Sequence, residues 1–224
     1  MQAPDRLLAA WLAAVAPTGT AVATGPIEPA LAFDEGEAAE VARAVARRRD
    51  EFLTGRALAR RALAELGCPP TAIPVGEGRM PIWPDPYLGS ISHCDGLCVA
   101  HVGRRRDLVG IGVDVERAGA LSPDLIADIS SPEEWDRLSR GQTPEIDAGT
   151  LCFSAKEAVF KAYFPAARTF LEFSDVYLEV DWGREAFAAS LAANDKPDVA
   201  GRRRIEGRFA GIGRYLATAV WIAR

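Results

Sequence analysis

Apolar and polar positions divide the chain into two successive groups of helical and strand-like segments. Residues 4–16, rich in Leu and Ala, predict a short helix. Residues 37–66 consist largely of strong helix formers and predict a long helix, which ends where Gly67 is followed by two prolines. Within this long helix, Thr54 and Gly55 are expected to weaken or kink it.

The rest of the first group predicts strands. Residues 76–90 are dense in Gly and Pro and indicate a loop. Short apolar runs at 91–93, 97–102 and 108–116 are separated by turn residues, and they predict strands joined by hairpins.

The second group repeats this order. Residues 117–149 are polar and irregular, with a short helix predicted at 132–138, and a helix containing residues 153–164 follows. Residues 171–182 and 203–223 alternate and are rich in Val, Tyr, Ile and Trp, as strands are.

Helix followed by strands in each group, without an alternating strand–helix–strand order, predicts the α+β class with largely antiparallel sheets. We divide the chain into an N-terminal half, residues 1–110, and a C-terminal half, residues 111–224. The two halves could be a distant duplication.

Charge and composition argue against a nucleic-acid-binding, membrane-spanning or secreted protein. The net charge of −5 argues against a nucleic-acid-binding protein, although clustered arginines at 47–61 and 104–106 allow a local anion site. No apolar run approaches the ~20 residues that a membrane span needs. No basic run precedes the apolar segment near the N-terminus, so a packed helix is favoured there over a secretory signal. We expect a cytoplasmic protein without a disulfide framework.

Four potential zinc ligands lie within nine residues: His93, Cys94, Cys98 and His101. Zinc sites usually pair their ligands in tight knuckles joined by a longer loop. Because residues 97–102 read as a buried strand, these side chains would not converge readily, and zinc is the less favoured interpretation.

The strand at 108–116 carries two carboxylates, Asp114 and Glu116, on the same face as Gly110 and Gly112, whose small size would leave space for a ligand. Carboxylates this close repel each other, and a divalent cation such as Mg²⁺ would relieve the repulsion. A strand end whose acids simply face water is the alternative, and on this motif alone it is the preferred one.

Glu157 also has a structural interpretation. Ser154 and Glu157 have the spacing of a capping box, in which the glutamate folds back onto the start of its own helix. Glu157 and Lys161 are four residues apart and would form a weak surface pair. Arg56 and Arg60 share one helix face, which a solvated salt-bridged surface would also explain.

Several motifs together nevertheless resemble one family. These are GVDVE at 112–116 and FSAKEAVFK at 153–161, preceded by RRRDEFLTGR at 47–56, PIWP at 81–84 and GSISHC at 89–94. In this order they resemble the surfactin-type 4′-phosphopantetheinyl transferases, most closely the actinobacterial and enterobactin-type branch. The resemblance spans roughly residues 40 to 180.

The resemblance implies two pseudo-symmetric α+β halves with coenzyme A bound between them. The N-terminal half would bind the nucleotide, and the C-terminal half would hold the metal and the catalytic groups. The enzyme would transfer the phosphopantetheine arm of coenzyme A to a serine of an acyl, peptidyl or aryl carrier protein, releasing adenosine 3′,5′-bisphosphate.

The resemblance also implies roles for individual residues. Asp114, Glu116 and Glu157 would hold Mg²⁺, with Mn²⁺ as the alternative metal. Glu157 would accept the proton of the attacking serine, and Lys161 would neutralise or protonate the departing phosphate. Coenzyme A would be bound by Arg48, Arg56, Arg79, Ser92, His93 and Lys156, with Arg79 in place of a lysine that relatives often carry in this loop.

The implied partners are apo carrier proteins and coenzyme A, bound by a monomer, with no nucleic acid and no membrane. Two alternatives remain at this point. One is a catalytically silent module that keeps only the binding cleft. The other is a different Mg²⁺-dependent phosphotransferase, although the glycine-rich loop of the nucleotide-hydrolysing enzymes is missing from the sequence.

Overall fold

The computed structural model describes residues 3–28, 35–192 and 194–224, and it confirms an α+β fold with two antiparallel sheets. The first sheet has the order β1-β3-β2 and consists of β1 (Ala21–Pro26), β2 (Tyr87–Cys94) and β3 (Leu97–Arg104). The second sheet has the order β4-β8-β7-β6-β5. Its strands are β4 (Leu108–Arg117), β5 (Val176–Asp181), β6 (Ala186–Leu191), β7 (Arg204–Ile212) and β8 (Tyr215–Ala223).

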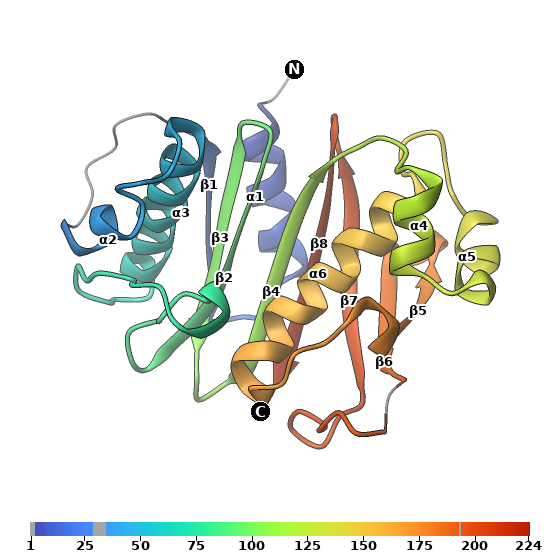
Figure 1. Ribbon diagram of the computed structural model, residues 1–224. Coiled ribbons are helices and arrows are strands. Elements are labelled where there is room, and N and C mark those ends of the chain that lie inside the picture. The colour runs from blue at the N-terminus through green and yellow to red at the C-terminus, as the bar shows by residue number, and fades with distance from the viewer. Residues whose placement is uncertain (1–2, 29–34, 193) are drawn as a thin grey trace.

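Each sheet is covered by one helix of 20 residues, α3 (Ala46–Glu65) on the first and α6 (Ala148–Ala167) on the second (Figure 1). The shorter helices are α1 (Pro4–Val15), α2 (Glu35–Glu40), α4 (Pro123–Ile129) and α5 (Pro132–Ser139). Single 3-10 turns occur at η1 (Glu77–Arg79), η2 (Phe173–Asp175) and η3 (Trp182–Arg184).

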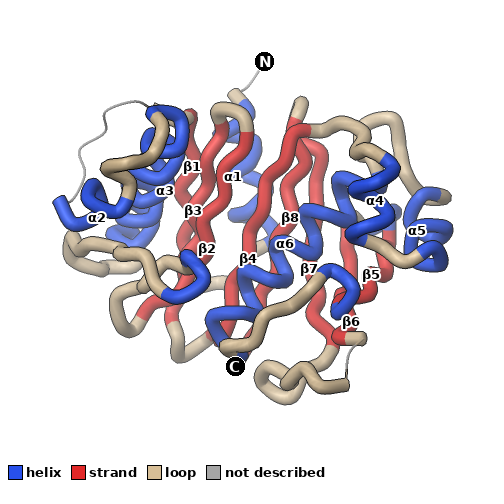
Figure 2. Tube along the Cα trace, viewed as in Figure 1, coloured by secondary structure: helices blue, strands red, loops and turns tan. Residues whose placement is uncertain are grey.

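The two halves meet where β2 lies beside β4, although these strands belong to different sheets (Figure 2). On the side away from α6, helix α1 contributes Leu8 and Leu12 to a core that also contains Val99 of the first sheet and Val113 and Ala217 of the second. Helix α1 therefore packs against the backs of both sheets and joins the halves.

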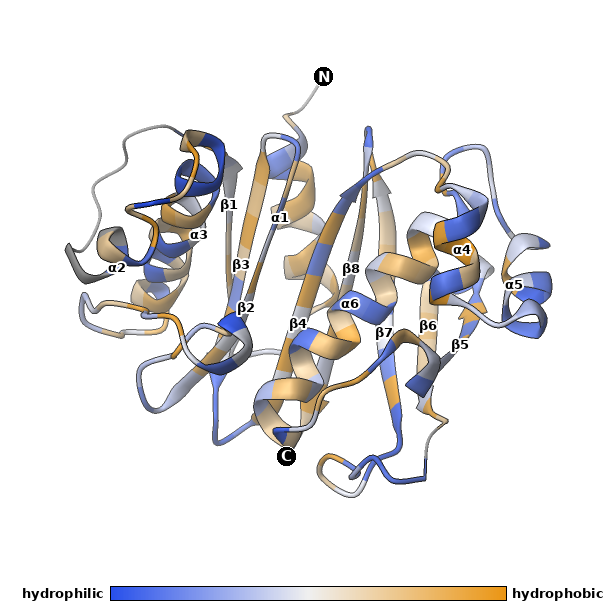
Figure 3. Ribbon diagram, in the orientation of Figure 1, coloured by the Kyte–Doolittle hydropathy of each residue, from blue (hydrophilic) through white to orange (hydrophobic). Residues whose placement is uncertain are grey.

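Apolar residues colour β3 strongly in Figure 3, whereas α5 is mainly hydrophilic. The apolar character of β3 agrees with its burial, because almost every residue of this strand is buried. No helix within the described ranges has both the length and the apolar character needed to cross a membrane.

The predicted helix at 4–16 is confirmed as α1, but the predicted helix at 37–66 is two helices. The chain leaves the helical conformation at residues 41–45 rather than at Thr54 and Gly55, which lie inside a continuous α3. Gly55 has a packing reason, because a Cβ there would lie 2.8 Å from Ile91 of β2. The expected kink at Thr54 and Gly55 is therefore wrong.

The predicted hairpin between residues 97–102 and 108–116 is also wrong. Strands β2 and β3 do form a hairpin, but β4 leaves for the second sheet, where it pairs with β8. A short turn has the same sequence pattern whether the strand after it pairs with the strand before it or joins another sheet.

The capping box expected at Ser154 and Glu157 is contradicted, because α6 begins nearly two turns earlier at Ala148. Asp147 caps the helix instead, and its side chain accepts a hydrogen bond from the backbone N–H of Thr150 at 2.8 Å. Ser154 and Glu157 are thus interior helix positions whose side chains are available for other contacts.

Candidate active site

Strand β4 presents its predicted polar face to α6. Val113 and Val115 pack in the core with α1, so the alternation puts Asp114 and Glu116 on the opposite side. Cβ atoms at Gly110 and Gly112 would lie 2.4 and 1.8 Å from carbonyl oxygens of α6. The glycines therefore permit close approach of the helix, and the expectation that they leave ligand space is wrong.

Asp114 is the most densely contacted carboxylate of this region and is only 2% exposed. Its Oδ1 accepts hydrogen bonds from Ser92 Oγ at 2.8 Å and Lys161 Nζ at 2.6 Å. Its Oδ2 accepts one from Ser154 Oγ at 2.8 Å. Residues from β2 and α6 thus converge on one side chain of β4, at the junction of the halves.

Lys161 directs its ammonium group towards this cluster. Besides Asp114, it contacts Ser92 Oγ at 3.2 Å and the carbonyl of Val113 at 3.5 Å. Its side chain is 26% exposed, so part of the group faces solvent. Ser92, which the resemblance assigned to coenzyme A, donates to Asp114 and accepts from Lys161 in this structure.

Glu116 and Glu157 lie near the same cluster. Burial, reinforced by the charge of Asp114, raises the pKa of Glu116 to about 7. Burial also raises the pKa of Glu157, with Lys161 opposing the rise and Asp114 adding to it. These shifts show that three acids share a region in which Lys161 supplies positive charge.

The described residues include no group of three His, Cys, Asp or Glu side chains arranged closely enough to hold a metal ion. The four potential zinc ligands lie on two strands, His93 and Cys94 on β2 and Cys98 and His101 on β3, where the last two occupy opposite faces. Cys98 packs under α3, whereas the ring of His101 contacts Trp221 at 5.8 Å on the other side.

A second polar group lies at the end of β2 nearest α3. Arg48 Nη1 is 2.9 Å from His93 Nε2, and Glu51 lies 3.6 Å from Arg48 and 3.7 Å from His93 Nδ1. Burial lowers the pKa of His93, and Glu51 opposes the change. Arg48 and His93, both predicted to bind coenzyme A, are therefore in contact.

Arg56 lies in α3, about two turns after Arg48. It is 5% exposed, its Nε donates to the carbonyl of Ile73 at 2.7 Å, and its guanidinium lies 4.4 Å from the centre of the Phe52 ring. Burial lowers its pKa to about 10. This is not the solvated surface that its spacing from Arg60 allowed, although Arg60 does form an ion pair with Glu37.

Arg79 is exposed and lies in a left-handed conformation with φ of 64° in the loop between α3 and β2. It lines a cavity of about 190 Å³ together with Glu157 and Lys161. Ser90 and Ile91 of β2 complete the opposite wall. The cavity thus lies between the halves, as the resemblance implied, and contains three of the predicted residues.

Lys156 is the predicted site residue that the structure separates from the others. Its ammonium group is buried and donates to Glu134 Oε2 at 2.8 Å and to the carbonyls of Ile129 at 2.7 Å and Phe173 at 3.0 Å. The expectation that Lys156 contacts phosphate does not agree with this placement, because its side chain is only 2% exposed and all three of its N–H groups have protein acceptors.

Sequence reasoning missed Ser154, Glu51 and Glu134 as partners of the predicted residues. Ser154 was within the FSAKE motif, but its spacing from Glu157 imitated a capping box. Glu134 lies in a polar segment whose pattern predicted a short helix but gave no indication of a contact with Lys156.

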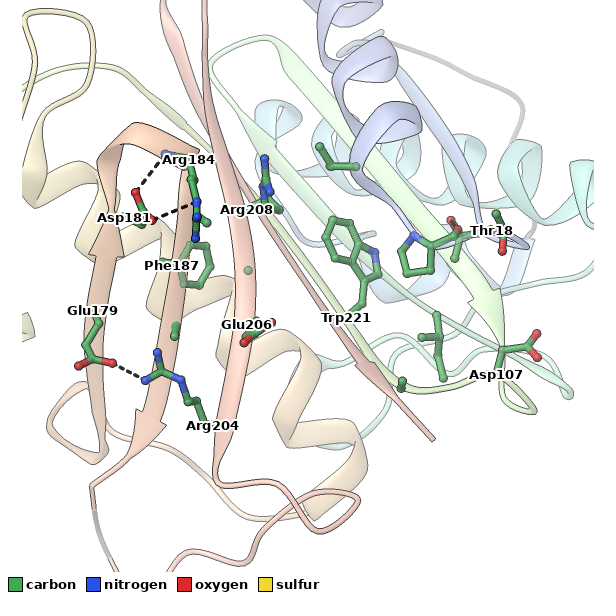
Figure 4. Close-up of a pocket in the computed structure, with 18 of the residues that line it drawn as sticks. Thr18, Asp107, Glu179, Asp181, Arg184, Phe187, Arg204, Glu206, Arg208 and Trp221 are labelled. Atoms are coloured by element: carbon green, nitrogen blue, oxygen red, sulfur yellow. Dashed lines mark hydrogen bonds and ion pairs between the residues drawn. The ribbon is translucent and has the colours of Figure 1, made fainter.

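A larger cavity of about 770 Å³ lies on the other face of the second sheet, beside Trp221 (Figure 4). Its charged side chains have both signs, and two pairs neutralise each other, Arg184 with Asp181 and Arg204 with Glu179. None of the site residues predicted from the sequence lines it. The candidate active site is therefore the smaller cavity between the halves.

Comparison with known proteins identifies the family. Residues 36–103 match the 4′-phosphopantetheinyl transferase N-terminal domain, and residues 110–207 match the 4′-phosphopantetheinyl transferase superfamily.

Three relatives illustrate the similarity. The 4′-phosphopantetheinyl transferase Svp of Streptomyces mobaraensis is 38% identical over 97% of this chain and 89% of its own length. The 4′-phosphopantetheinyl transferase PptT of Mycobacterium tuberculosis is 40% identical over 63% of each chain. Enterobactin synthase component D of Salmonella typhi is 39% identical over 52% of this chain and 49% of its own. The resemblance drawn from the motifs is confirmed, and the chain belongs to the 4′-phosphopantetheinyl transferase family.

Proposed function

We propose that this transferase, which moves the phosphopantetheine arm of coenzyme A onto carrier proteins, performs the transfer in the cavity between β2, the loop at 78–81 and α6. The observation that carries the proposal is the convergence of Ser92, Lys161 and Ser154 on Asp114. This arrangement gathers acids and a lysine from both halves beside a cavity lined by Glu157.

The chemistry of the donors suits Mg²⁺, since Asp114, Glu116 and Glu157 offer hard oxygen ligands, although in this structure the three side chains are not gathered closely enough to hold an ion. Burial and the charge of Asp114 raise the pKa of Glu116 to about 7, so ionising this carboxyl is unfavourable here unless a cation accompanies it. We propose that these three carboxylates hold Mg²⁺, or alternatively Mn²⁺. When bound, the ion would neutralise charge on the diphosphate of coenzyme A.

The chain's own groups supply the remaining chemistry. Glu157, whose pKa burial raises, is a suitable acceptor for the proton of the attacking serine hydroxyl. Lys161 faces the same cavity and would donate to the departing phosphate oxygen. The leaving group in this proposal is adenosine 3′,5′-bisphosphate.

We assign the nucleotide to residues 1–110 and the metal and catalytic groups to residues 111–224. The paired Arg48 and His93 and the buried Arg56 supply cationic and donor groups for the nucleotide phosphates, and Arg79 is the loop cation. Ser92 would act through Asp114 rather than on coenzyme A.

The acceptors proposed are apo acyl, peptidyl or aryl carrier proteins. The relative named enterobactin synthase component D favours carriers of siderophore or peptide synthesis. A cytoplasmic monomer is proposed, and all four cysteines being free is consistent with a reducing compartment.

The experiment incubates the protein with coenzyme A, Mg²⁺ and an apo carrier protein and measures the mass of the carrier. We expect a gain of one phosphopantetheine unit, abolished by chelation and by Glu157→Gln. Circular dichroism should show that Glu157→Gln remains folded, because this residue does not cap its helix. Normal turnover by Glu157→Gln would exclude it as the base, and a carrier of unchanged mass with the native enzyme would refute the proposed acceptors.

A further inference from the structure

Lys156 and Glu134 form an ion pair inside the C-terminal half. The two side chains are 2% and 3% exposed, and the ammonium and carboxylate are 2.8 Å apart. Two backbone carbonyls, those of Ile129 and Phe173, complete the acceptors of the ammonium group. Because each N–H group of the buried Lys156 ammonium has an acceptor, the network holds this side chain in one position.

Glu134 extends the network to the sheet. Its Oε1 accepts a hydrogen bond from the backbone N–H of Leu178 at 2.6 Å. Leu178 belongs to β5, the edge strand of the second sheet, so this bond satisfies a donor without a neighbouring strand. Through two side chains, α6 is therefore joined to the end of α4, to α5, to η2 and to β5.

The network lies directly behind the proposed base. Glu157 follows Lys156 in α6, about 100° around the helix axis. Both residues line a cavity of about 100 Å³, whose wall also includes Phe160, Leu171 and Phe173. The Lys156 contacts thus fix both the rotation of this turn of α6 and the segment that forms the opposite wall.

We propose that Lys156 is a positioning residue, which holds Glu157 and the 171–173 wall in register through its buried bond to Glu134 and does not touch the phosphates of coenzyme A. The proposal rests on the role proposed for Glu157. Direct phosphate contact would require the ammonium to leave Glu134 as an unpaired buried carboxylate, which is strongly unfavourable.

The test compares Lys156→Met, Glu134→Gln and the double variant in the carrier assay, with kcat and KM for coenzyme A measured separately. In the double variant, the oxygen of the new glutamine amide can still accept from the backbone N–H of Leu178. Its nitrogen can donate to one of the released carbonyls, and no charge remains buried. Lys161→Met, alone and combined with Glu134→Gln, is the matched control for a lysine in the cavity.

For Lys156→Met, we expect a loss in kcat of about 100-fold with KM for coenzyme A changed by less than about threefold. Glu134→Gln should also lower kcat, although Glu134 is buried away from coenzyme A. The double variant should recover at least about tenfold of the loss relative to Lys156→Met, whereas Glu134→Gln should not rescue Lys161→Met.

If Lys156→Met does not fold, the double variant alone decides the matter through its kcat and KM. A KM for coenzyme A raised about tenfold or more in every variant lacking Lys156 would overturn the proposal in favour of phosphate contact. Altered melting temperatures with unchanged kcat would overturn it in favour of a purely structural role. An inactive native enzyme would instead indicate failure of the proposed function.

Discussion

At the scale of single residues, Ser154 shows how closely the carboxylate at the junction depends on its neighbours. Ser154 is fully buried, donates to Asp114 Oδ2 at 2.8 Å and lies 2.9 Å from Thr218 Oγ1. Ser154→Ala should lower the free energy of unfolding by about 1–3 kcal/mol, since a buried carboxylate oxygen loses its donor. Urea denaturation measures the change, and Ser139→Ala, at the half-buried end of α5, is the control. Equal losses in the two variants would contradict the argument.

His101 is a buried residue whose two ring nitrogens have no hydrogen-bond partner within the described part of the chain. Burial lowers its pKa from 6.5 to about 3. The folded state therefore excludes a proton that the unfolded state binds below pH ~6.5, so stability falls as the pH drops from ~6.5 towards ~3, by up to ~1.4 kcal/mol per pH unit.

His101→Leu should abolish this pH dependence and should be at least as stable as the native protein at pH ~7, because no unsatisfied polar ring is buried. Between pH ~7 and ~5, the native protein should lose ~2 kcal/mol more than the variant. Denaturant titrations at both pH values measure the difference. Parallel losses would show that His101 is not the group responsible.

Arg56 allows a test of nucleotide binding. Its guanidinium lies in α3 with only Nε engaged by the Ile73 carbonyl among the bonds seen in the described residues. If the remaining N–H groups bind the 3′-phosphate, Arg56→Ala should weaken coenzyme A by about 2 kcal/mol and 3′-dephospho-coenzyme A by much less. Calorimetry with both compounds measures this, and equal weakening would separate Arg56 from the 3′-phosphate.

At the scale of elements, the contact between β4 and α6 is set by glycine. A Cβ at Gly112 would lie 1.8 Å from the carbonyl oxygen of Ala158, whereas one at Gly119 would meet no atom within 4 Å. Gly112→Ala should therefore destabilise the protein by about 3 kcal/mol or more and reduce transfer, because α6 carries Glu157. Gly119→Ala should change neither melting temperature nor rate. A stable, active Gly112→Ala variant would refute this account.

Several elements could be predicted from local patterns, since α1, α5 and strands β3, β4, β5 and β8 follow composition and alternation. Strand β1, helix α4 and the first half of β2, which lies in the segment predicted to be a loop, were not predicted. The elements with which each strand and helix pairs in the folded structure could not be predicted. The turn after β3 looked like a hairpin turn, yet β4 pairs with β8, about a hundred residues later. Likewise, Ser154 imitated a helix cap because the true cap, Asp147, precedes a turn of small residues without a strong helical signal.

The sequence was sufficient to predict which candidate site residues share a face of β4. It was not sufficient to predict the individual contacts that the site residues make. The alternation of β4 correctly placed Asp114 and Glu116 together, opposite Val113 and Val115. The direction of Lys156 depends on Glu134, which comes from another helix and is set by tertiary packing. Motif spacing carries no information about such a partner.

At the scale of the whole molecule, α1 joins the two halves. Leu12 is fully buried in the core between the sheets, whereas Leu7 of the same helix is 37% exposed. Leu12→Ala should cost about 2–5 kcal/mol and lower the stability of both halves together, while Leu7→Ala should cost under about 1 kcal/mol.

Tryptophan fluorescence and circular dichroism should follow one coincident unfolding transition for Leu12→Ala as for the native protein. Two separate transitions would show that the halves unfold independently and that α1 does not couple them.

The position of β8 has a consequence for synthesis of the protein. Residues 215–223 form an interior strand between β4 and β7, and the core that α1 completes contains Ala217 and Ala219. Neither the second sheet nor the packing of the earliest helix can be finished before these late residues leave the ribosome. The nascent chain therefore carries exposed apolar surface until residues 215–223 have been synthesised, a state that favours protection by chaperones.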